Sequence, residues 1–390
     1  MNERIYFDNA ATTAVRQEVI DAMLPYYSKE FGNPSSIHNY GTTAAQAVSE
    51  SRQTLANVIN ARPEDIYFTS GGSESDNWAI ELAACNKKGK HIIISRIEHH
   101  AILRKCEAMK EKGYDISVID VDEWGVVKLN ELIKAIRKDT ILISVMTANN
   151  EIGTIEPIER IGRIARANDI LFHTDAVQAF AQIHINVREM NIDMLSACAH
   201  KLHGPKGVGL LYAGERVKMK PMIYGGMQEN GARAGTENVP GIVGFAKAAK
   251  LSIDGYNERI RRILYLRNYL ISRIMSEVPF VRLNGHPTNR LPSNANFSFQ
   301  FVEGESLVIL LDLKGISVSS GSACSQGDTN PSYVLSAIGV PQDMAYSAVR
   351  LTISEDTTKN DIDTAVEAIK EVVAELRSKS SMYNSLMRRR

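Results

Sequence analysis

One pattern repeats from residue 66 to about residue 213: a short apolar run, polar residues, and then a stretch with helical spacing. Short apolar runs that end in polar residues are typical of buried strands in a parallel sheet. Strands that alternate with helices predict an α/β fold with a mostly parallel, doubly wound sheet. The expected strands are residues 66–68, 91–94, 116–119, 141–146 and 170–172, with others near Met194 and after Gly209. The carboxyl ends of such strands carry the chemistry, so the polar residues there are the first candidates for a site.

Two of these strand ends offer a carboxylate and an amine. Asp175 follows the apolar run at residues 170–172, and Lys201 follows the run around Met194. A partly buried ion pair is one interpretation of these two residues. The other is a pyridoxal phosphate (PLP) site, in which a lysine amine forms a Schiff base with the cofactor aldehyde and a carboxylate keeps the pyridine nitrogen protonated. The choice depends on whether other parts of the chain supply pieces of the same site.

A Gly/Ser-rich segment, residues 69–76, lies between the expected strand at residues 66–68 and the helical run at residues 78–84. A strand, a loop and a helix start in this order bind phosphate through free backbone N–H groups and the helix dipole. Ser73 and Glu74 also suit an ordinary helix cap. The segment matches neither a Walker loop nor a G-x-G-x-x-G fingerprint, which counts against ATP and dinucleotides.

The composition excludes several classes of function. The chain has 45 Lys and Arg residues against 45 Asp and Glu residues, which gives no electrostatic case for a nucleic acid or membrane partner. Its start lacks the apolar region of a signal peptide and no later stretch is long enough to span a bilayer, which predicts a cytoplasmic protein. The four cysteines, Cys85, Cys106, Cys198 and Cys324, show no C-x-x-C pair and no zinc-like spacing, so no metal site is expected. In the cytosol they would stay reduced, and at least one could be a working thiol.

The second half of the chain predicts a long helix followed by a smaller α+β unit. Residues 239–275 have helical spacing, and the charged, periodic stretch at residues 257–273 within them would be a long helix that links two domains. Beyond them, the expected strands are residues 294–301, 316–319 and 348–353, and the expected helices are residues 305–313 and 359–376. We expect a large domain of residues 14–255 and a small domain of residues 1–13 and 256–390. The small domain would carry a Gly/Ser-rich loop at about residues 320–331.

Ten motifs follow one another along essentially the whole chain. They are FDNAATT, GNPSS, TSGGSESDN, EHHA, NNEIGT, HTDAVQA, SACAHKLHGPKG, GARAGTEN, SSGSAC and PSYVL. Together and in this order, they resemble the motifs of the PLP-dependent cysteine desulfurases of the NifS/IscS type. These enzymes belong to the class V aminotransferases of fold type I. The name of the reaction rests on this resemblance, since the spacing of residues does not give it.

The resemblance implies roles around the cofactor ring. Lys201 would form the Schiff base, Asp175 would hold the pyridine nitrogen and His99 would stack on the ring face. Gln178 would lie by the ring hydroxyl, and Asn150 would lie between the cofactor and the substrate.

The resemblance also implies how the cofactor phosphate is held. Gly72, Ser73 and His200 would bind it, and Thr236 would reach it from a second subunit of a homodimer with shared active sites. The family usually has a serine at the position of Cys198. Because a thiol is a poorer hydrogen-bond donor than a hydroxyl, we expect weaker phosphate binding at Cys198.

For the reaction, the resemblance implies that Arg350 and Asn150 hold the carboxylate of L-cysteine. The Cys324 thiolate would take the sulfur as a persulfide and leave L-alanine. A thiolate is required, so its surroundings or a nearby base such as His99 must favour it. The sulfur would then pass to an acceptor, such as an iron–sulfur scaffold protein that contacts Cys324 transiently and could share a cluster ligand with it.

Three alternatives stay open. A selenocysteine lyase or cysteine sulfinate desulfinase need not use Cys324, and an aminotransferase would make no persulfide. A non-catalytic scaffold or sensor could retain the same fold. The last alternative is disfavoured by the presence of Lys201, Asp175, His99, Arg350 and Cys324.

Overall fold

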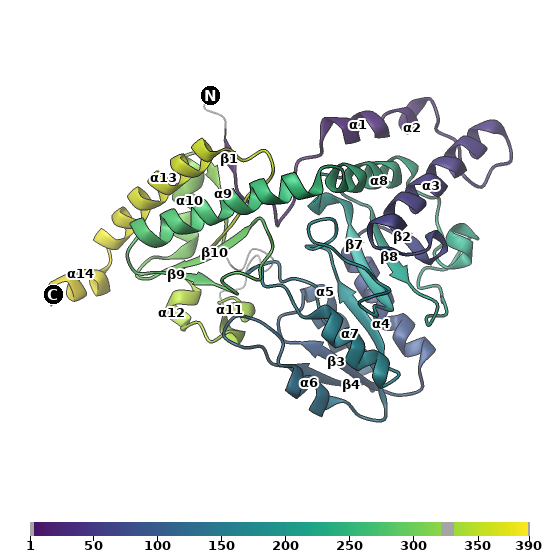
Figure 1. Cartoon of the computed structure of the whole chain (residues 1–390), viewed down its shortest axis with the longest axis horizontal. Helices are drawn as coiled ribbons and strands as arrows, with labels where there is room; N and C mark the ends of the chain where they lie inside the picture. Colours follow the sequence, from purple (N-terminus) through teal and green to yellow (C-terminus); the bar gives the residue numbers. More distant parts are fainter. Residues whose placement is uncertain (1–3, 321–330, 389–390) are drawn as a thin grey trace.

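The structure, a computed structural model, describes residues 4–320 and 331–388, and a seven-stranded sheet forms the centre of its larger part (Figure 1). The strand order is β2-β8-β7-β6-β5-β3-β4. The strands are β2 (Ile66–Thr69), β3 (His91–Ser95), β4 (Asp115–Ile119), β5 (Thr140–Ser144), β6 (Leu171–Asp175), β7 (Met194–Cys198) and β8 (Gly209–Ala213). Within this sheet β8 runs antiparallel to both of its neighbours, and the remaining neighbouring strands are parallel.

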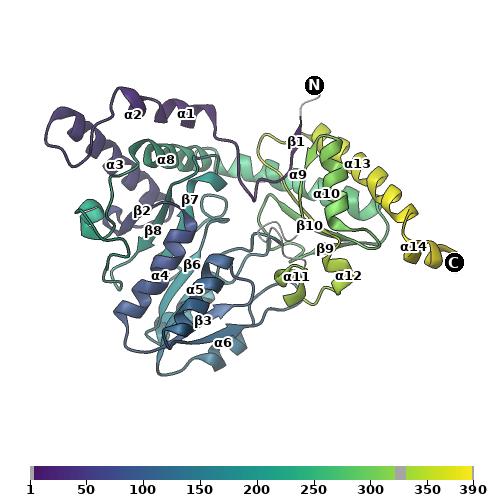
Figure 2. The same cartoon turned by 180° about the vertical axis from the view of Figure 1, so that it is seen from behind.

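Helices cover both faces of this sheet. Successive strand residues point to opposite sides, so the apolar side chains on each face need a covering layer. Ile92 and Ile94 pack with α4 and α5, whereas Ile93 packs in the core that contains α3, α7 and α8. Figure 2 shows α4 and α5 lying across one face. The helices are α3 (Asn39–Val58), α4 (Gly72–Asn86), α5 (His100–Glu111), α6 (Leu129–Ala135), α7 (Ile158–Ala167) and α8 (Val239–Ile253). The predicted doubly wound, mostly parallel sheet is confirmed.

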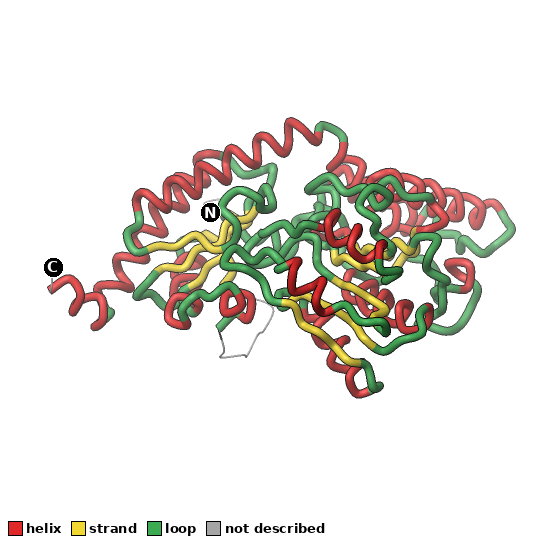
Figure 3. The backbone as a smooth tube through the Cα atoms, turned by 60° about the horizontal axis from the view of Figure 1, so that its bottom comes forward, coloured by secondary structure: helices red, strands yellow, loops and turns green. Residues whose placement is uncertain are grey.

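A second, smaller unit is built on a four-stranded antiparallel sheet of order β12-β13-β10-β9 (Figure 3). Its elements are β9 (Val281–Asn284), β10 (Asn294–Phe299), β12 (Ser319–Ser320), β13 (Ala348–Thr352), α10 (Gly304–Leu313) and α13 (Lys359–Ser378). The start of the chain joins this unit, since β1 (Ile5–Tyr6) pairs with β11 (Ile316–Ser317) and Phe7 is buried in the core of the unit. The exact division at residues 13/14 and 255/256 stays a prediction.

The helical run expected at residues 239–275 consists of two helices, α8 and α9 (Tyr256–Glu277), which follow one another across the top of Figure 1. The break lies at Gly255, whose φ of 73° is left-handed and suits glycine. The first turn of α9 packs on the large unit, where Arg259 Nη2 donates to the Ala181 carbonyl at 2.7 Å. From Ile263 onward α9 packs in the core of the small unit, so it connects the two units.

Short elements complete the described chain. They are α1 (Gln17–Met23), α2 (Pro25–Ser28), α11 (Tyr333–Ala337), α12 (Gln342–Ala345) and α14 (Ser381–Arg388). The strand expected at residues 316–319 is divided into β11 and β12 by Val318, so this prediction is wrong in detail. In the described residues, none of the helices combines the length and apolar character that a membrane crossing requires.

Candidate active site

A cavity of about 370 Å³ opens where β6 and β7 end. The predicted site residues that line it are Gly72, Ser73, His99, Asn150, Asp175, Gln178, Cys198, His200, Lys201 and Arg350. Thr236 instead lines a separate cavity of about 80 Å³, and its predicted contribution to a second subunit stays a prediction. Cys324 lies outside the described residues. The assignments of individual roles also stay predictions, although the fold brings their side chains to one place.

Lys201 and Asp175 occupy neighbouring strand ends, as expected. Lys201 ends a short 3₁₀ turn that directly follows β7, and its amine donates to the carbonyls of Ala10 at 2.5 Å and Ala11 at 2.7 Å. Asp175 is the last residue of β6, and its carboxylate accepts the Val177 N–H at 2.8 Å. Burial raises the pKa of Asp175, while His99, the Val177 N–H and Lys201 act in the opposite direction.

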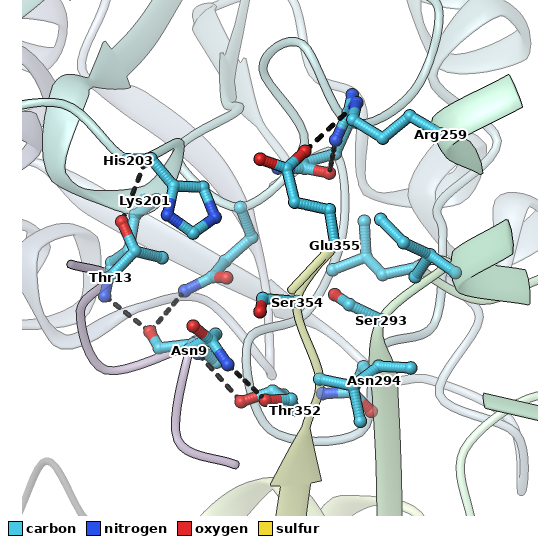
Figure 4. A pocket seen from close by; sticks show the side chains of 16 residues that line it. Asn9, Thr13, Lys201, His203, Arg259, Ser293, Asn294, Thr352, Ser354 and Glu355 are labelled. Carbon is cyan, nitrogen blue, oxygen red and sulfur yellow. Dashed lines mark hydrogen bonds and ion pairs between the residues drawn. The ribbon is translucent and has the colours of Figure 1, made fainter. Parts of the chain in front are cut away.

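The N-terminal segment forms one wall of the cavity beside Lys201. The Gln178 side chain and the Lys201 amine both donate to the Ala10 carbonyl (Figure 4). Lys201, Gln178 and Ala10 also line a second cavity of about 30 Å³, which has room for roughly two water molecules. Its other polar neighbours include Asn9, His203 and Glu355, and sequence reasoning did not anticipate this cavity.

His99 and His100 have different environments. His99 is the N-cap of α5, and its Nδ1 accepts the Ala101 N–H at 3.2 Å. In the neutral ring the proton of His99 therefore lies on Nε2. The His100 ring packs against Tyr333, with 5.0 Å between ring centroids. His99 lines the cavity, whereas His100 is a packing residue beside it.

The start of α4 lies at one end of the cavity. This helix begins at Gly72, well before the apolar run from which it was predicted, because its first turn is polar. A Cβ at Gly72 would lie 2.6 Å from Val177 Cγ2, so the close approach requires glycine. Burial lowers the pKa of His200 to about 4, so this side chain is a neutral N–H donor near pH 7. Backbone N–H groups at a helix start and a neutral donor can hold a phosphate.

Arg350 comes from β13 of the small unit and closes the cavity from the other side. It donates to the Asn150 carbonyl at 3.0 Å and to Asp8 Oδ1 at 2.9 Å. Arg350 Nε and Asn150 Oδ1 are buried and have no hydrogen-bond partner among residues 4–320 and 331–388. Because buried polar atoms are normally satisfied, this pair indicates a place for a polar ligand group.

Sequence reasoning missed two carboxylates, Asp8 and Asp76. Asp8 lies in the first motif, but its partner Arg350 is 342 positions away, and no local pattern joins them. Asp76 lines the cavity and is only 1% exposed. It lies one turn after Gly72, so a helix predicted from Gly72 onward would have placed the Asp76 side chain on the same face of the helix as Gly72.

The described cysteines differ in accessibility. Cys85 is exposed, whereas Cys106 and Cys198 are buried. Burial raises the pKa of both buried thiols to about 12, so neither forms a thiolate near neutral pH. Cys198 therefore cannot act as a thiolate nucleophile, although it lines the cavity.

A doubly wound sheet that carries a lysine and a carboxylate at neighbouring strand ends, above one cavity, is the arrangement expected of a fold type I PLP-dependent enzyme. The aminotransferase class-V family model matches residues 5–365. The cysteine desulfurase IscS of Methanosarcina thermophila is 50% identical over 383 residues, which cover 98% of this chain and 95% of that protein. The chain belongs to the class-V aminotransferases and, within them, to the cysteine desulfurases of the NifS/IscS type.

Two solved structures agree with this family. A NifS-like protein has a TM-score of 0.89 at 36% identity, and the match covers 95% of this chain and 99% of that one. SspA, solved in complex with cysteine, has a TM-score of 0.78 at 34% identity, with coverage of 91% and 100%.

Proposed function

We propose that this protein is a PLP-dependent cysteine desulfurase that converts L-cysteine into L-alanine and leaves the sulfur as a persulfide on Cys324. The observation that carries the proposal is that one cavity is lined by Lys201 and Asp175 from the large unit and by Arg350 from the small unit. The family supports the same reaction, since the relative from Methanosarcina thermophila is named a cysteine desulfurase.

The residues around the cavity fit PLP. Lys201 would hold the aldehyde carbon, Asp175 the ring nitrogen, His99 the ring face and Gln178 the ring hydroxyl. The start of α4 at Gly72 and Ser73, together with His200 and Cys198, would hold the phosphate. When bound, PLP supplies an electron-accepting ring that allows the α-proton of L-cysteine to leave and weakens its Cβ–Sγ bond.

The protein's own groups would orient the substrate and move protons. Arg350 and Asn150 would bind the cysteine carboxylate, and the unsatisfied Arg350 Nε, an N–H donor, supports this. SspA, a relative of similar fold, was solved with cysteine bound. The Lys201 amine would take the α-proton and return a proton to the product. His99 lines the cavity, and its Nε2 would exchange protons with the reacting groups.

The sulfur transfer would occur at Cys324. Its thiolate attacks the substrate sulfur, a new S–S bond forms, and the electron pair of the Cβ–Sγ bond goes to Cβ. Cβ then takes a proton, which yields alanine. The persulfide sulfur would pass to an acceptor protein for iron–sulfur cluster assembly or other sulfur transfer, in the cytoplasm.

Release of sulfide and alanine from L-cysteine tests the function directly. With a thiol reductant present, the purified holoenzyme should release both products in equal amounts. If glutamate or a keto acid forms instead and no sulfide appears, the protein is an aminotransferase. If only selenocysteine is consumed, it is a selenocysteine lyase.

We also propose a homodimer with two shared active sites, to which Thr236 contributes across the interface. The loop that carries Thr236 is tied to the start of α4, since Arg233 Nε donates to Glu74 Oε1 at 3.0 Å. In the same loop region, Tyr224 is 82% and Met227 is 79% exposed, and a second subunit would cover these apolar side chains.

Light scattering should therefore give about twice the chain mass of 43.2 kDa. Thr236→Ala should weaken PLP binding without changing this mass. A fully active species with the mass of one chain would contradict the shared-site proposal.

Cys198→Ser is expected to tighten PLP binding by up to about 1 kcal/mol, roughly fivefold in Kd. A hydroxyl donates a stronger hydrogen bond to phosphate than the Cys198 thiol does. The measurement is the Kd from fluorescence titration of the cofactor-depleted protein, with the exposed Cys85→Ser as the matched control. An unchanged or higher Kd would mean that Cys198 only packs and that other donors hold the phosphate.

A further inference from the structure

Asp76 and Asp175 place two buried carboxyl groups side by side in the floor of the cavity. Asp76 is 1% exposed and Asp175 is 5% exposed. A carboxylate oxygen of each and a ring nitrogen of His99 all lie within 4.8 Å of one another. Asp76 Oδ1 has no hydrogen-bond partner within residues 4–320 and 331–388. Two like charges this close, on carboxyl groups that are almost fully buried, strongly disfavour each other.

His173 is a basic group near Asp76, but it does not carry the positive charge that would neutralise the carboxylate. Its Nε2 lies 3.7 Å from Asp76 Oδ1. The ring is fully buried and held between two hydroxyls, with Nδ1 at 2.9 Å from Ser144 Oγ and Nε2 at 3.0 Å from Ser196 Oγ. Burial lowers the pKa of His173 to about 3, so the ring is neutral near pH 7.

The other groups around the pair favour a charge on Asp175 rather than on Asp76. Asp175 has the Val177 N–H at 2.8 Å, and Lys201 and His99 stabilise its ionised form. For Asp76, the charge of Asp175 opposes ionisation, and a hydrogen bond from Ser196 acts in the opposite direction without offsetting the effect of burial. Among the residues that the structure describes, five other titratable groups lie around the pair. They come from the β3–α5 connection, from β6, from β7 and from the turn after β7, and they are Glu98, His99, His173, Cys198 and Lys201.

We propose that Asp76 is a positioning residue that keeps one proton in this carboxyl pair, so that Asp175 stays ionised toward the ring nitrogen of PLP. Burial is the largest cause that raises the pKa of Asp76 well above its ordinary value, and the nearby charge of Asp175 adds to it. The pair then presents one negative charge to one protonated ring nitrogen. Two carboxyls with different environments divide these roles in the same way at other acid–base sites. The contact with the ring nitrogen, and with it any change in the visible band of the cofactor, rests on the proposed function.

Infrared spectroscopy of the holoenzyme tests where the proton lies. With ¹³C-labelled aspartate, wild type at neutral pH should show a protonated carboxylic acid band that shifts with the label, and Asp76→Asn should lose it. Glu156→Gln is the matched control, because Glu156 is a buried carboxyl with a raised pKa that does not line the cavity. That variant should lose an unlabelled band and keep the labelled one. If Asp76→Asn does not fold, Asp76→Ser gives the same comparison.

The visible band of the bound cofactor gives a second readout. In wild type, loss of the Asp76 proton at alkaline pH puts a second negative charge beside the ring and should shift the band in an additional step. Asp76→Asn should lack this step, and Glu156→Gln should retain it. The proposal is overturned if wild type shows no labelled acid band, or if Asp76→Asn keeps the labelled band or the alkaline step. Neither measurement uses turnover. A holoenzyme that gives the expected infrared and visible results but releases no alanine would therefore contradict only the proposed function.

Discussion

Cys324→Ala is expected to stop alanine production from L-cysteine while the cofactor's visible band remains. The loss should be on the order of 10³-fold or more, the scale on which removal of a nucleophile acts. The Cβ–Sγ bond cannot break at a useful rate without a group that accepts the sulfur. Because Lys201 and Asp175 are unchanged, the variant should still bind L-cysteine, which a shift of the visible band would report.

The remaining cysteines sharpen this experiment. Cys85→Ala is the matched control, since Cys85 is exposed, and it should keep the wild-type rate. Cys106 and Cys198 are buried thiols whose pKa burial raises to about 12, so they are poor sulfur acceptors. Mass spectrometry of wild type given L-cysteine without reductant should find one added sulfur on the peptide that contains Cys324, and reductant should remove it.

One further variant and one further substrate separate the alternative functions. Cys324→Ser should be nearly as inactive as Cys324→Ala, because a serine hydroxyl is hardly ionised at neutral pH. Selenocysteine turnover could survive either change, since selenium is a better leaving group than sulfur. The desulfurase proposal fails if Cys324→Ala releases alanine from L-cysteine at the wild-type rate. It also fails if the added sulfur is found only on Cys85, Cys106 or Cys198.

The strand ends could be predicted from the sequence because each buried strand is a short apolar run with polar residues behind it. Asp175 and Lys201 follow such runs directly, and the parallel register places them at one edge. The strand pattern therefore predicted that Asp175 and Lys201 lie close together at one edge of the sheet. The residues that complete it from the small unit, above all Arg350, were placed by resemblance, since no local pattern connects distant segments.

Other features lacked a sequence signal for physical reasons. The first turn of α4 is polar because it faces the cavity, so apolar spacing detects this helix only from about Trp78. Because the helix was predicted to begin too late, Asp76 was not recognised as part of its first turns. The helical spacing at residues 239–275 did not by itself locate the break at Gly255, since a single glycine is a weak signal of a helix end. The Asp8–Arg350 pair depends on the N-terminal segment crossing to β13, which the small core around Phe7 brings about.

Lys201→Ala is expected to abolish the visible band of the cofactor and to reduce alanine formation by several orders of magnitude. The band depends on the covalent bond between the lysine amine and the cofactor aldehyde. The side chain of an alanine at position 201 has no amine that could form this bond. The protein should stay folded, because the Lys201 amine donates to the Ala10 and Ala11 carbonyls at the cavity wall, and water in the cavity can replace these hydrogen bonds.

Lys206→Ala is the matched control for this change. Lys206 lies five positions further along the chain and is exposed, and it does not line the cavity of Lys201. It should keep both the band and the activity. Asp175→Ala forms the complementary test: the covalent bond can still form, but the ring nitrogen loses its counter-charge, so cofactor affinity and turnover should fall together. A Lys201→Ala protein that keeps the band and turns over L-cysteine normally would show that another amine holds the cofactor. The arrangement of Lys201 and Asp175 at neighbouring strand ends would then be a structural ion pair, the alternative that the sequence alone left open.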